Sequence, residues 1–200
     1  FAMSEALTII FKANDPTKAA KQISLSQLGS IKLDKDETKK MVTTIPRSSV
    51  LGFIIGVLPG AGATIASFLA YGMERNFVND EEKQKFGKGS VNGIAAPETA
   101  NNAACSGSFV PLLTLGIPGS GTTAVMLGAL LGFGIQPGPR LYQTNPEIFW
   151  SVIMSMYIGM VVLLILNLPL IPYIARVLAT PRTFLIPLIL FFSLTGVYLM

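Results

Sequence analysis

Two short glycine-rich motifs carry the residue types in this sequence that are best suited to binding a ligand. The first, at residues 59–64, reads Pro-Gly-Ala-Gly-Ala-Thr, and the second, at residues 118–123, reads Pro-Gly-Ser-Gly-Thr-Thr. Each follows an apolar run and precedes a segment rich in alanine, leucine and glycine. Glycine lets the main chain turn and approach a ligand closely, and proline ends or kinks a helix. We therefore predict that both motifs are breaks in membrane helices and that together they form a binding site.

The chemistry of such breaks favours an organic anion and a hard cation. The helix after each break points its N-terminus at the site, with about half a positive charge and free N–H groups. Carbonyl groups freed before the break suit Na⁺. We assign substrate binding to the motif residues Gly60, Ala61, Gly62, Thr64, Gly119, Ser120, Gly121, Thr122 and Thr123. We assign cation coordination to Pro59, Asn101, Asn102 and Pro118, and expect no other metal site.

Two other interpretations of these residues stay open. The glycines and prolines of the motifs can serve only as kinks and as points of close helix packing. Glu98, the charged residue within residues 93–134, is either a proton carrier in the membrane or a solvated residue in the first turn of a helix. A P-loop is excluded, because no Gly-Lys-Ser/Thr follows either motif.

The composition indicates an α-helical integral membrane protein that is not an enzyme. Half of the 200 residues are hydrophobic and 13% are charged, against about 25% in an average soluble domain. The sequence has no histidine, the usual proton shuttle and commonest metal ligand. Its single cysteine, Cys105, excludes a disulfide within the chain, and we interpret it as a small apolar filler. With no acidic metal cluster and no nucleophile–base pair, we predict no catalysis and no cofactor.

The chain divides into three predicted regions. Residues 1–47 are expected to hold the end of a preceding helix and a basic cytoplasmic loop at 12–47, with a short surface helix at 24–28. Residues 48–140 are the predicted transport core, and residues 141–200 hold transmembrane spans. The net charge of +4 lies mainly in loops, which favours membrane orientation over nucleic-acid binding. No signal peptide begins the chain, and we expect a fragment of a longer polypeptide.

Within the core, the arms on either side of Pro59 and Gly60 are shorter than the ~20 residues that a span needs. Residues 48–74 therefore predict a re-entrant hairpin, with one kinked span as the alternative. A helix is expected to begin at residues 95–98, with Pro97 in its first turn. Residues 109–117 and 122–133 together reach a spanning length and predict one discontinuous transmembrane helix.

The last region predicts ordinary membrane spans. Residues 149–168 form an apolar run of spanning length, with Trp150 placed at the membrane interface. Two prolines at residues 169–172 predict the end of that helix, and residues 184–200 predict the start of another span. The predicted fold class is an all-α integral membrane protein, a multi-span helical bundle with a re-entrant hairpin and a discontinuous helix.

Two stretches closely resemble the large membrane subunit of the tripartite tricarboxylate transporter family. They are GVLPGAGATIASFLAYGME at residues 56–74 and KGSVNGIAAPETANNAACSGSFVPLLTLGIPGSGTTAVMLGALLGFGIQPGP at residues 88–139. The family subunit is more than twice as long, so the resemblance identifies this chain as part of its second half. It implies half of an inverted-repeat transporter, with several spans in the bacterial inner membrane.

The resemblance also implies a substrate and partners. Family members work with a small membrane subunit of the four-helix type and a periplasmic solute-binding protein that delivers citrate or another carboxylate. Uptake is driven by a cation gradient, often of Na⁺, with H⁺ as the other choice. The lipid bilayer is a further expected partner, and nucleic acid is not. The alternative function is a membrane scaffold that docks a partner without a substrate site of its own.

Overall fold

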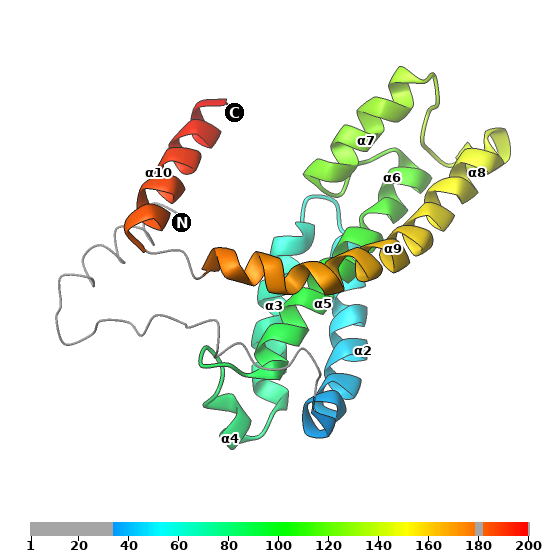
Figure 1. Ribbon diagram of the computed structural model, residues 1–200. Coiled ribbons are helices and arrows are strands. Elements are labelled where there is room, and N and C mark those ends of the chain that lie inside the picture. The colour runs from blue at the N-terminus through cyan, green and yellow to red at the C-terminus, as the bar shows by residue number, and fades with distance from the viewer. Residues whose placement is uncertain (1–33, 179–181, 200) are drawn as a thin grey trace. The chain divides into compact units, whose positions relative to one another are not determined.

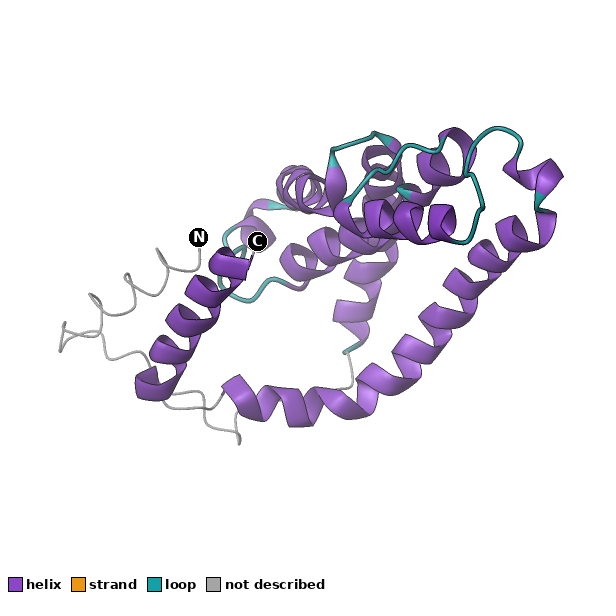
Figure 2. Ribbon diagram, turned by 90° about the horizontal axis from the view of Figure 1, so that it is seen from above, coloured by secondary structure: helices purple, strands orange, loops and turns teal. Residues whose placement is uncertain are grey.

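The computed structural model describes residues 34–178 and 182–199, and every regular element in these residues is an α-helix (Figures 1 and 2). The predicted all-α class is therefore confirmed for the described residues. The chain divides into two compact units, residues 32–160 and residues 1–31 with 161–200. The first of these units contains both glycine-rich motifs. The predicted surface helix at residues 24–28 lies outside the described residues. The helices are α2 (Lys35–Val57), α3 (Gly62–Phe77), α4 (Asp80–Lys83), α5 (Val91–Gly107), α6 (Phe109–Leu115), α7 (Gly121–Gly132), α8 (Leu141–Thr144), α9 (Pro146–Leu178) and α10 (Arg182–Leu199).

Helix α2 begins well before the apolar run that forms its second half. Asp34 caps the helix by accepting a hydrogen bond from the Lys35 N–H, and Glu37 accepts one from the Asp34 N–H at 2.9 Å. This reciprocal cap satisfies N–H groups that a helix start leaves without partners. The prediction of a loop through residue 47 is therefore wrong for residues 35–47. A capped, charged first half continues directly into the apolar second half.

Helices α2 and α3 form a hairpin, because Glu74 near the end of α3 contacts Thr44 and Arg47 in the first half of α2. The two helices therefore fold back on each other about the turn at Pro59 (Figure 1). This geometry confirms a hairpin and excludes one kinked helix over residues 48–74. Re-entry of the hairpin into a membrane stays a prediction.

Helix α5 packs against this hairpin through small residues. The buried residues of α2 are Thr44, Ser48, Gly52 and Gly56, and those of α5 are Asn92, Ala96, Ala100, Ala104 and Gly107. A Cβ atom on Gly52 would lie 2.6 Å from the Ala100 Cα, and one on Gly56 would lie 2.6 Å from the Ala104 Cα. The residue numbers differ by the same amount in both pairs, so α2 and α5 run parallel. Their main chains touch because both helices carry small residues at every fourth position.

Two predicted helix boundaries near prolines are wrong. Helix α5 starts at Val91 rather than at residues 95–98, because the Ser90 hydroxyl caps it by accepting a bond from the Gly93 N–H at 3.1 Å. Pro97 therefore lies inside the helix. Helix α9 continues through residues 169–172 to Leu178. A proline's fixed φ is itself helical, so these prolines remove hydrogen bonds without ending the helix.

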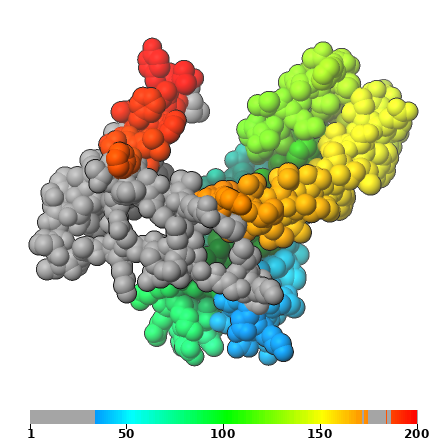
Figure 3. Space-filling view, in the orientation of Figure 1, coloured from blue at the N-terminus to red at the C-terminus, as the bar shows by residue number. Residues whose placement is uncertain are grey.

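The first part of α9 is the best candidate for a membrane span. Pro146–Ile171 is long enough and apolar enough to cross a bilayer, by length and composition. Apolar side chains of α7 and of the start of α9 are widely exposed, including Val125 and Trp150, and both segments lie on the face shown in Figure 3. Such surfaces suit a lipid environment. The other predicted spans, including one at residues 184–200, stay predictions.

Candidate functional site

The first glycine-rich motif forms the turn between α2 and α3. Gly60 and Gly62 have φ angles of +82° and +70°, a region that favours glycine because it lacks a Cβ atom. The predicted break at Pro59 is therefore confirmed. Ala61 occupies the N-cap position of α3 and provides no side-chain cap. The first N–H groups of α3, including that of Thr64, are thus left for water or a ligand.

The second motif separates α6 from α7, as predicted, but the two helices do not form one continuous line. Gly116, with φ +70°, ends α6, and the chain then returns to Ser108, at the start of α6. A Cβ atom on Gly119 would lie 3.0 Å from the Ser108 Cβ. Helix α7 consequently runs beside α6, and its Met126 packs against the cluster of Leu113, Leu141 and Val152. The expected single span made of two end-to-end halves is wrong, because the left-handed glycine reverses the chain.

The start of α7 is capped by its own hydroxyl side chains. The Ser120 N–H donates to the Thr123 Oγ1 at 2.8 Å, and the Thr123 N–H donates to the Ser120 Oγ at 3.3 Å. Thr123 is buried, whereas Gly121 and Thr122 are exposed. The hydroxyl groups of Ser120 and Thr123 are therefore engaged in capping α7. The N–H groups of Gly121 and Thr122, and the Thr122 hydroxyl, are the groups best placed for a ligand.

The structure brings the two breaks together at one end of the α2–α3–α5 bundle (Figure 1). A Cβ atom on Gly119 would lie 3.4 Å from the Gly56 carbonyl oxygen, in the last turn of α2. The α2–α3 turn begins two residues after Gly56. The two breaks, each followed by the positive end of a helix dipole, therefore lie close together.

The residues that we predicted to coordinate a cation do not lie at one site. Asn101 and Asn102 are consecutive in α5 and point in directions about 100° apart. The Cys105 thiol donates to the Asn101 Oδ1 at 3.7 Å, whereas the Asn102 Nδ2 donates to the Glu98 carbonyl at 2.9 Å. Asn102 also precedes Ser108 by six residues, about 9 Å along the helix, so it lies apart from the breaks. Cys105 is exposed, which is a correction to its interpretation as an apolar filler.

A polar hollow of about 350 Å³ lies between α2, α5 and α9. It is lined by Ser49, Glu98, Thr99, Asn102, Ala103, Ser106 and Met160. Glu98 is exposed in the middle of α5, neither in a first turn nor paired with a basic residue among the described residues. The interpretation of Glu98 as a first-turn residue is therefore wrong.

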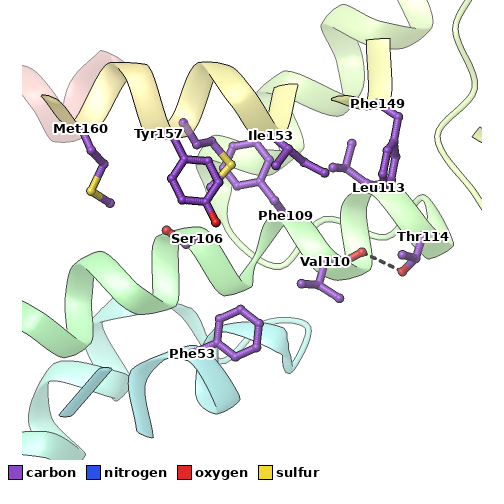
Figure 4. Close-up of a pocket in the computed structure, with 11 residues that line it drawn as sticks. Phe53, Ser106, Phe109, Val110, Leu113, Thr114, Phe149, Ile153, Tyr157 and Met160 are labelled. Atoms are coloured by element: carbon purple, nitrogen blue, oxygen red, sulfur yellow. Dashed lines mark hydrogen bonds between the residues drawn. The ribbon is translucent and has the colours of Figure 1, made fainter. Parts of the chain in front are cut away.

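A second hollow, of about 400 Å³, is apolar (Figure 4). Helices α2, α5, α6 and α9 line it with Phe53, Ser106, Phe109, Val110, Leu113, Thr114, Phe149, Ile153, Met156, Tyr157 and Met160. The Thr114 hydroxyl donates to the Val110 carbonyl at 2.7 Å, as the dashed line in Figure 4 marks, so it is already satisfied. No charged side chain lines this hollow, which makes it unsuitable for a carboxylate.

A buried polar network at the other end of the bundle is a feature that the sequence interpretation missed. The Glu74 carboxylate is fully buried and accepts two bonds from the Arg47 guanidinium, at 2.8 and 3.0 Å. It also accepts bonds from the Thr44 hydroxyl at 2.8 Å and from the Asn92 Nδ2 at 3.2 Å. The Arg47 guanidinium stacks on the Phe77 ring. Thr44, Ser48, Gly52 and Gly56 at four-residue intervals were the available signal for this helix face.

A second group of polar contacts holds the short helix α4 against α2. The Glu82 carboxylate accepts a bond from Lys40 at 2.7 Å and one from the Ser90 hydroxyl at 2.8 Å. The hydrogen bond from Lys40, together with its charge and the bond from Ser90, holds the pKa of Glu82 below its ordinary value of 4.5, against the opposing effect of burial. The ionised form of Glu82 is therefore the form that the folded state favours.

This shift predicts a loss of stability in acid. Because the pKa of Glu82 is lower in the folded state than in the unfolded state, its contribution is complete above pH 4.5 and is lost as pH falls through the lowered pKa. Thermal unfolding of the wild type and of Glu82→Gln in detergent should differ at pH 7 and converge as the pH falls below the lowered pKa of Glu82. A difference that stayed constant over this range would contradict a contribution from the Glu82 charge.

Comparison with known proteins places the chain in a transporter family. The model of the tripartite tricarboxylate transporter TctA family matches residues 1–200. An uncharacterized 52.8 kDa protein in the TAR-I ttuC' 3' region of Agrobacterium vitis is 40% identical over 178 residues, covering 89% of this chain and 35% of that protein. An uncharacterized protein in the TAR-II ttuC' 3' region of the same organism is 46% identical over 147 residues, covering 74% of this chain and 60% of that protein.

No solved structure matches the chain. The chain spans about a third of the first curated relative and three fifths of the second. The match to the family model extends over both glycine-rich motifs and the helices that hold them. The chain therefore belongs to the tripartite tricarboxylate transporter TctA family.

Proposed function

We propose that this chain is part of the membrane subunit of a secondary transporter that takes up tricarboxylates or related organic acids. The observation that carries the proposal is that the two breaks are neighbours, with Gly119 near the Gly56 carbonyl oxygen, and that α3 and α7 begin after them, at Gly62 and Gly121. Their free N–H groups and positive dipole ends suit the carboxylate groups of such a substrate. Membership of the TctA family supports the same substrate class.

Neutral groups at this site can bind an anion that must later leave. Residues 48–74 and 89–139 contain no lysine and no arginine. Each hydrogen bond from an N–H group to a carboxylate contributes about 1.5–3 kcal/mol. The exposed hydroxyl groups of Thr64 and Thr122 add two donors beside those N–H groups. Several such bonds hold a carboxylate without the strong ion pair that a buried arginine would form.

The remaining parts of the proposal follow from membership of a tripartite family. The transporter lies in the bacterial inner membrane with several spans, and α9 is one of them. A periplasmic binding protein delivers the substrate, and a small membrane subunit completes the assembly. A gradient of Na⁺ or H⁺ drives uptake. The complete substrate site includes residues of the subunit that lie outside this chain.

The substitution Gly121→Leu tests the site without disturbing the fold. A Cβ atom on Gly121 would meet nothing within 4 Å, and its φ angle does not require glycine. A leucine side chain there would cover the N-terminus of α7 and displace a bound carboxylate. Uptake of radiolabelled citrate, and of a panel of di- and tricarboxylates, should fall at least about tenfold, equivalent to about 1.4 kcal/mol. The measurement uses vesicles with the full-length subunit and its partners.

Gly128→Leu provides the matched control. Gly128 lies two turns further along α7, is exposed, and also has open space around its Cβ position. This variant should insert into the membrane and transport at the wild-type rate. Normal transport by Gly121→Leu would show that the start of α7 is not part of the substrate site. Assembly with the partners but no carboxylate uptake by the wild type would favour the scaffold function.

A further inference from the structure

We propose that Glu98 and the neutral oxygen atoms around it form a binding site for Na⁺ in the polar hollow between α2 and α5. The role of this site in driving uptake rests on the proposed transport function. The site itself rests on the geometry of the hollow and on the charge of its lining. It differs from the cation site expected at the helix breaks, because Pro59 and Pro118 are not part of it.

The first observation is an unpaired carboxylate. Glu98 is exposed to the hollow, and the ion pairs of the described residues involve Glu74, Glu81 and Glu82 instead. Its contact is with the Asn102 Nδ2, which donates to the Glu98 carbonyl at 2.9 Å and lies 3.5 Å from the Oε1. An exposed carboxylate without a basic partner keeps its negative charge available for a cation. No lysine or arginine lies in residues 89–139.

The second observation is the set of neutral oxygen atoms beside this carboxylate. Asn102 uses its NH₂ group toward Glu98, so its Oδ1 remains an acceptor. The Ser106 hydroxyl lies eight residues after Glu98, about 12 Å along α5, and is too far away to bind the same ion. The hydroxyl groups of Ser49, on α2, and Thr99 also line the hollow, and no hydrogen bond engages either within the part of the chain that the structure describes.

This donor set selects a hard monovalent cation. Hard cations prefer oxygen ligands, and Ca²⁺ sites commonly combine several carboxylates. This hollow offers one carboxylate, with amide and hydroxyl oxygens around it. Among the described residues no group of three histidine, cysteine or acidic side chains could hold a transition metal. One negative charge balances one positive charge, and a volume of about 350 Å³ leaves room for water to complete the coordination.

Binding of ²²Na⁺ to the purified full-length subunit, with its membrane partner, tests the site directly. Wild-type protein should bind ²²Na⁺ saturably, and NaCl should raise its unfolding temperature more than choline chloride at equal ionic strength. Glu98→Gln should bind at least about tenfold more weakly and lose the specific Na⁺ effect. Because Glu98 is exposed and makes no ion pair, this variant should unfold at the wild-type temperature without Na⁺.

Glu147→Gln is the matched control, since Glu147 is an exposed, unpaired carboxylate at the start of α9. It should bind ²²Na⁺ like the wild type. Wild-type affinity in Glu98→Gln, or equal stabilisation by choline chloride, would overturn the Na⁺ site even if carboxylates are transported. Loss of ²²Na⁺ binding in Glu98→Gln, with no carboxylate uptake by the wild type, would support the site and overturn the transport function instead.

Discussion

Alanine at Gly52 or Gly56 is expected to destabilise the protein by about 3 kcal/mol or more, at the upper end of the cost of overpacking a core. Each new Cβ atom would lie 2.6 Å from a Cα atom of α5, where real Cβ atoms do not fit. The neighbouring atoms belong to the main chain, so no side chain can rotate away. Helices α2 and α5 must separate, which also loosens the cluster in which Ala66 of α3 packs with Ala100 of α5.

The midpoint of thermal unfolding in detergent measures this effect, and Gly72→Ala provides a control with the opposite sign. Gly72 lies in the middle of α3, is exposed, and has nothing within 4 Å of its Cβ position. Alanine there should stabilise the helix by about 0.5–1 kcal/mol. Equal effects of Gly52→Ala and Gly72→Ala would show that α2 and α5 do not make main-chain contact.

Glu74→Ala is expected to destabilise the protein by about 3 kcal/mol. The substitution leaves Arg47 without its bidentate partner and removes an acceptor from Thr44 and Asn92. We expect the lower end of the range for a broken buried ion pair, because the Arg47 side chain is 31% exposed and retains some water. Chemical or thermal unfolding of the detergent-solubilised protein measures the loss.

Two further variants separate the ion pair from the general effect of losing a charge. Arg75→Ala removes an exposed charge next to Glu74 and should change stability by less than about 0.5 kcal/mol. The double substitution Arg47→Met with Glu74→Met should recover most of the stability, because apolar side chains of similar size avoid an unpaired buried charge. A double variant as unstable as Glu74→Ala would indicate that the hydrogen bonds to Thr44 and Asn92 dominate.

Local sequence patterns were enough to predict the helical class, the family and the positions of the two helix breaks. These properties depend on residues that are adjacent in the chain. The positive φ angles at Gly60 and Gly62 are accessible to glycine on local steric grounds, so the turn was visible without a partner. The break before α7 was equally local, since Ser120 and Thr123 cap the helix three residues apart.

Prolines were less informative, because their effect depends on what surrounds them. Pro97 was expected in a first turn, yet it lies inside α5, with Ala96 and Ala100 buried on either side. The Ser67 hydroxyl of α3 donates to the Pro97 carbonyl at 3.1 Å. Packing and a hydrogen bond between helices offset the bond that proline removes, and neither can be read from the residues around position 97.

The contacts between polar residues, in contrast, depend on how the helices pack. The tertiary structure buried Glu74 against Arg47, 27 residues away, and turned Asn102 toward Glu98 while Asn101 faces elsewhere. The chain also folds back after Gly116, so that Gly119 lies against Gly56 beside the first break. Local steric limits determine where a helix starts and turns. Contacts between helices depend on close packing and on the pairing of buried polar groups across long separations, which a local pattern does not specify.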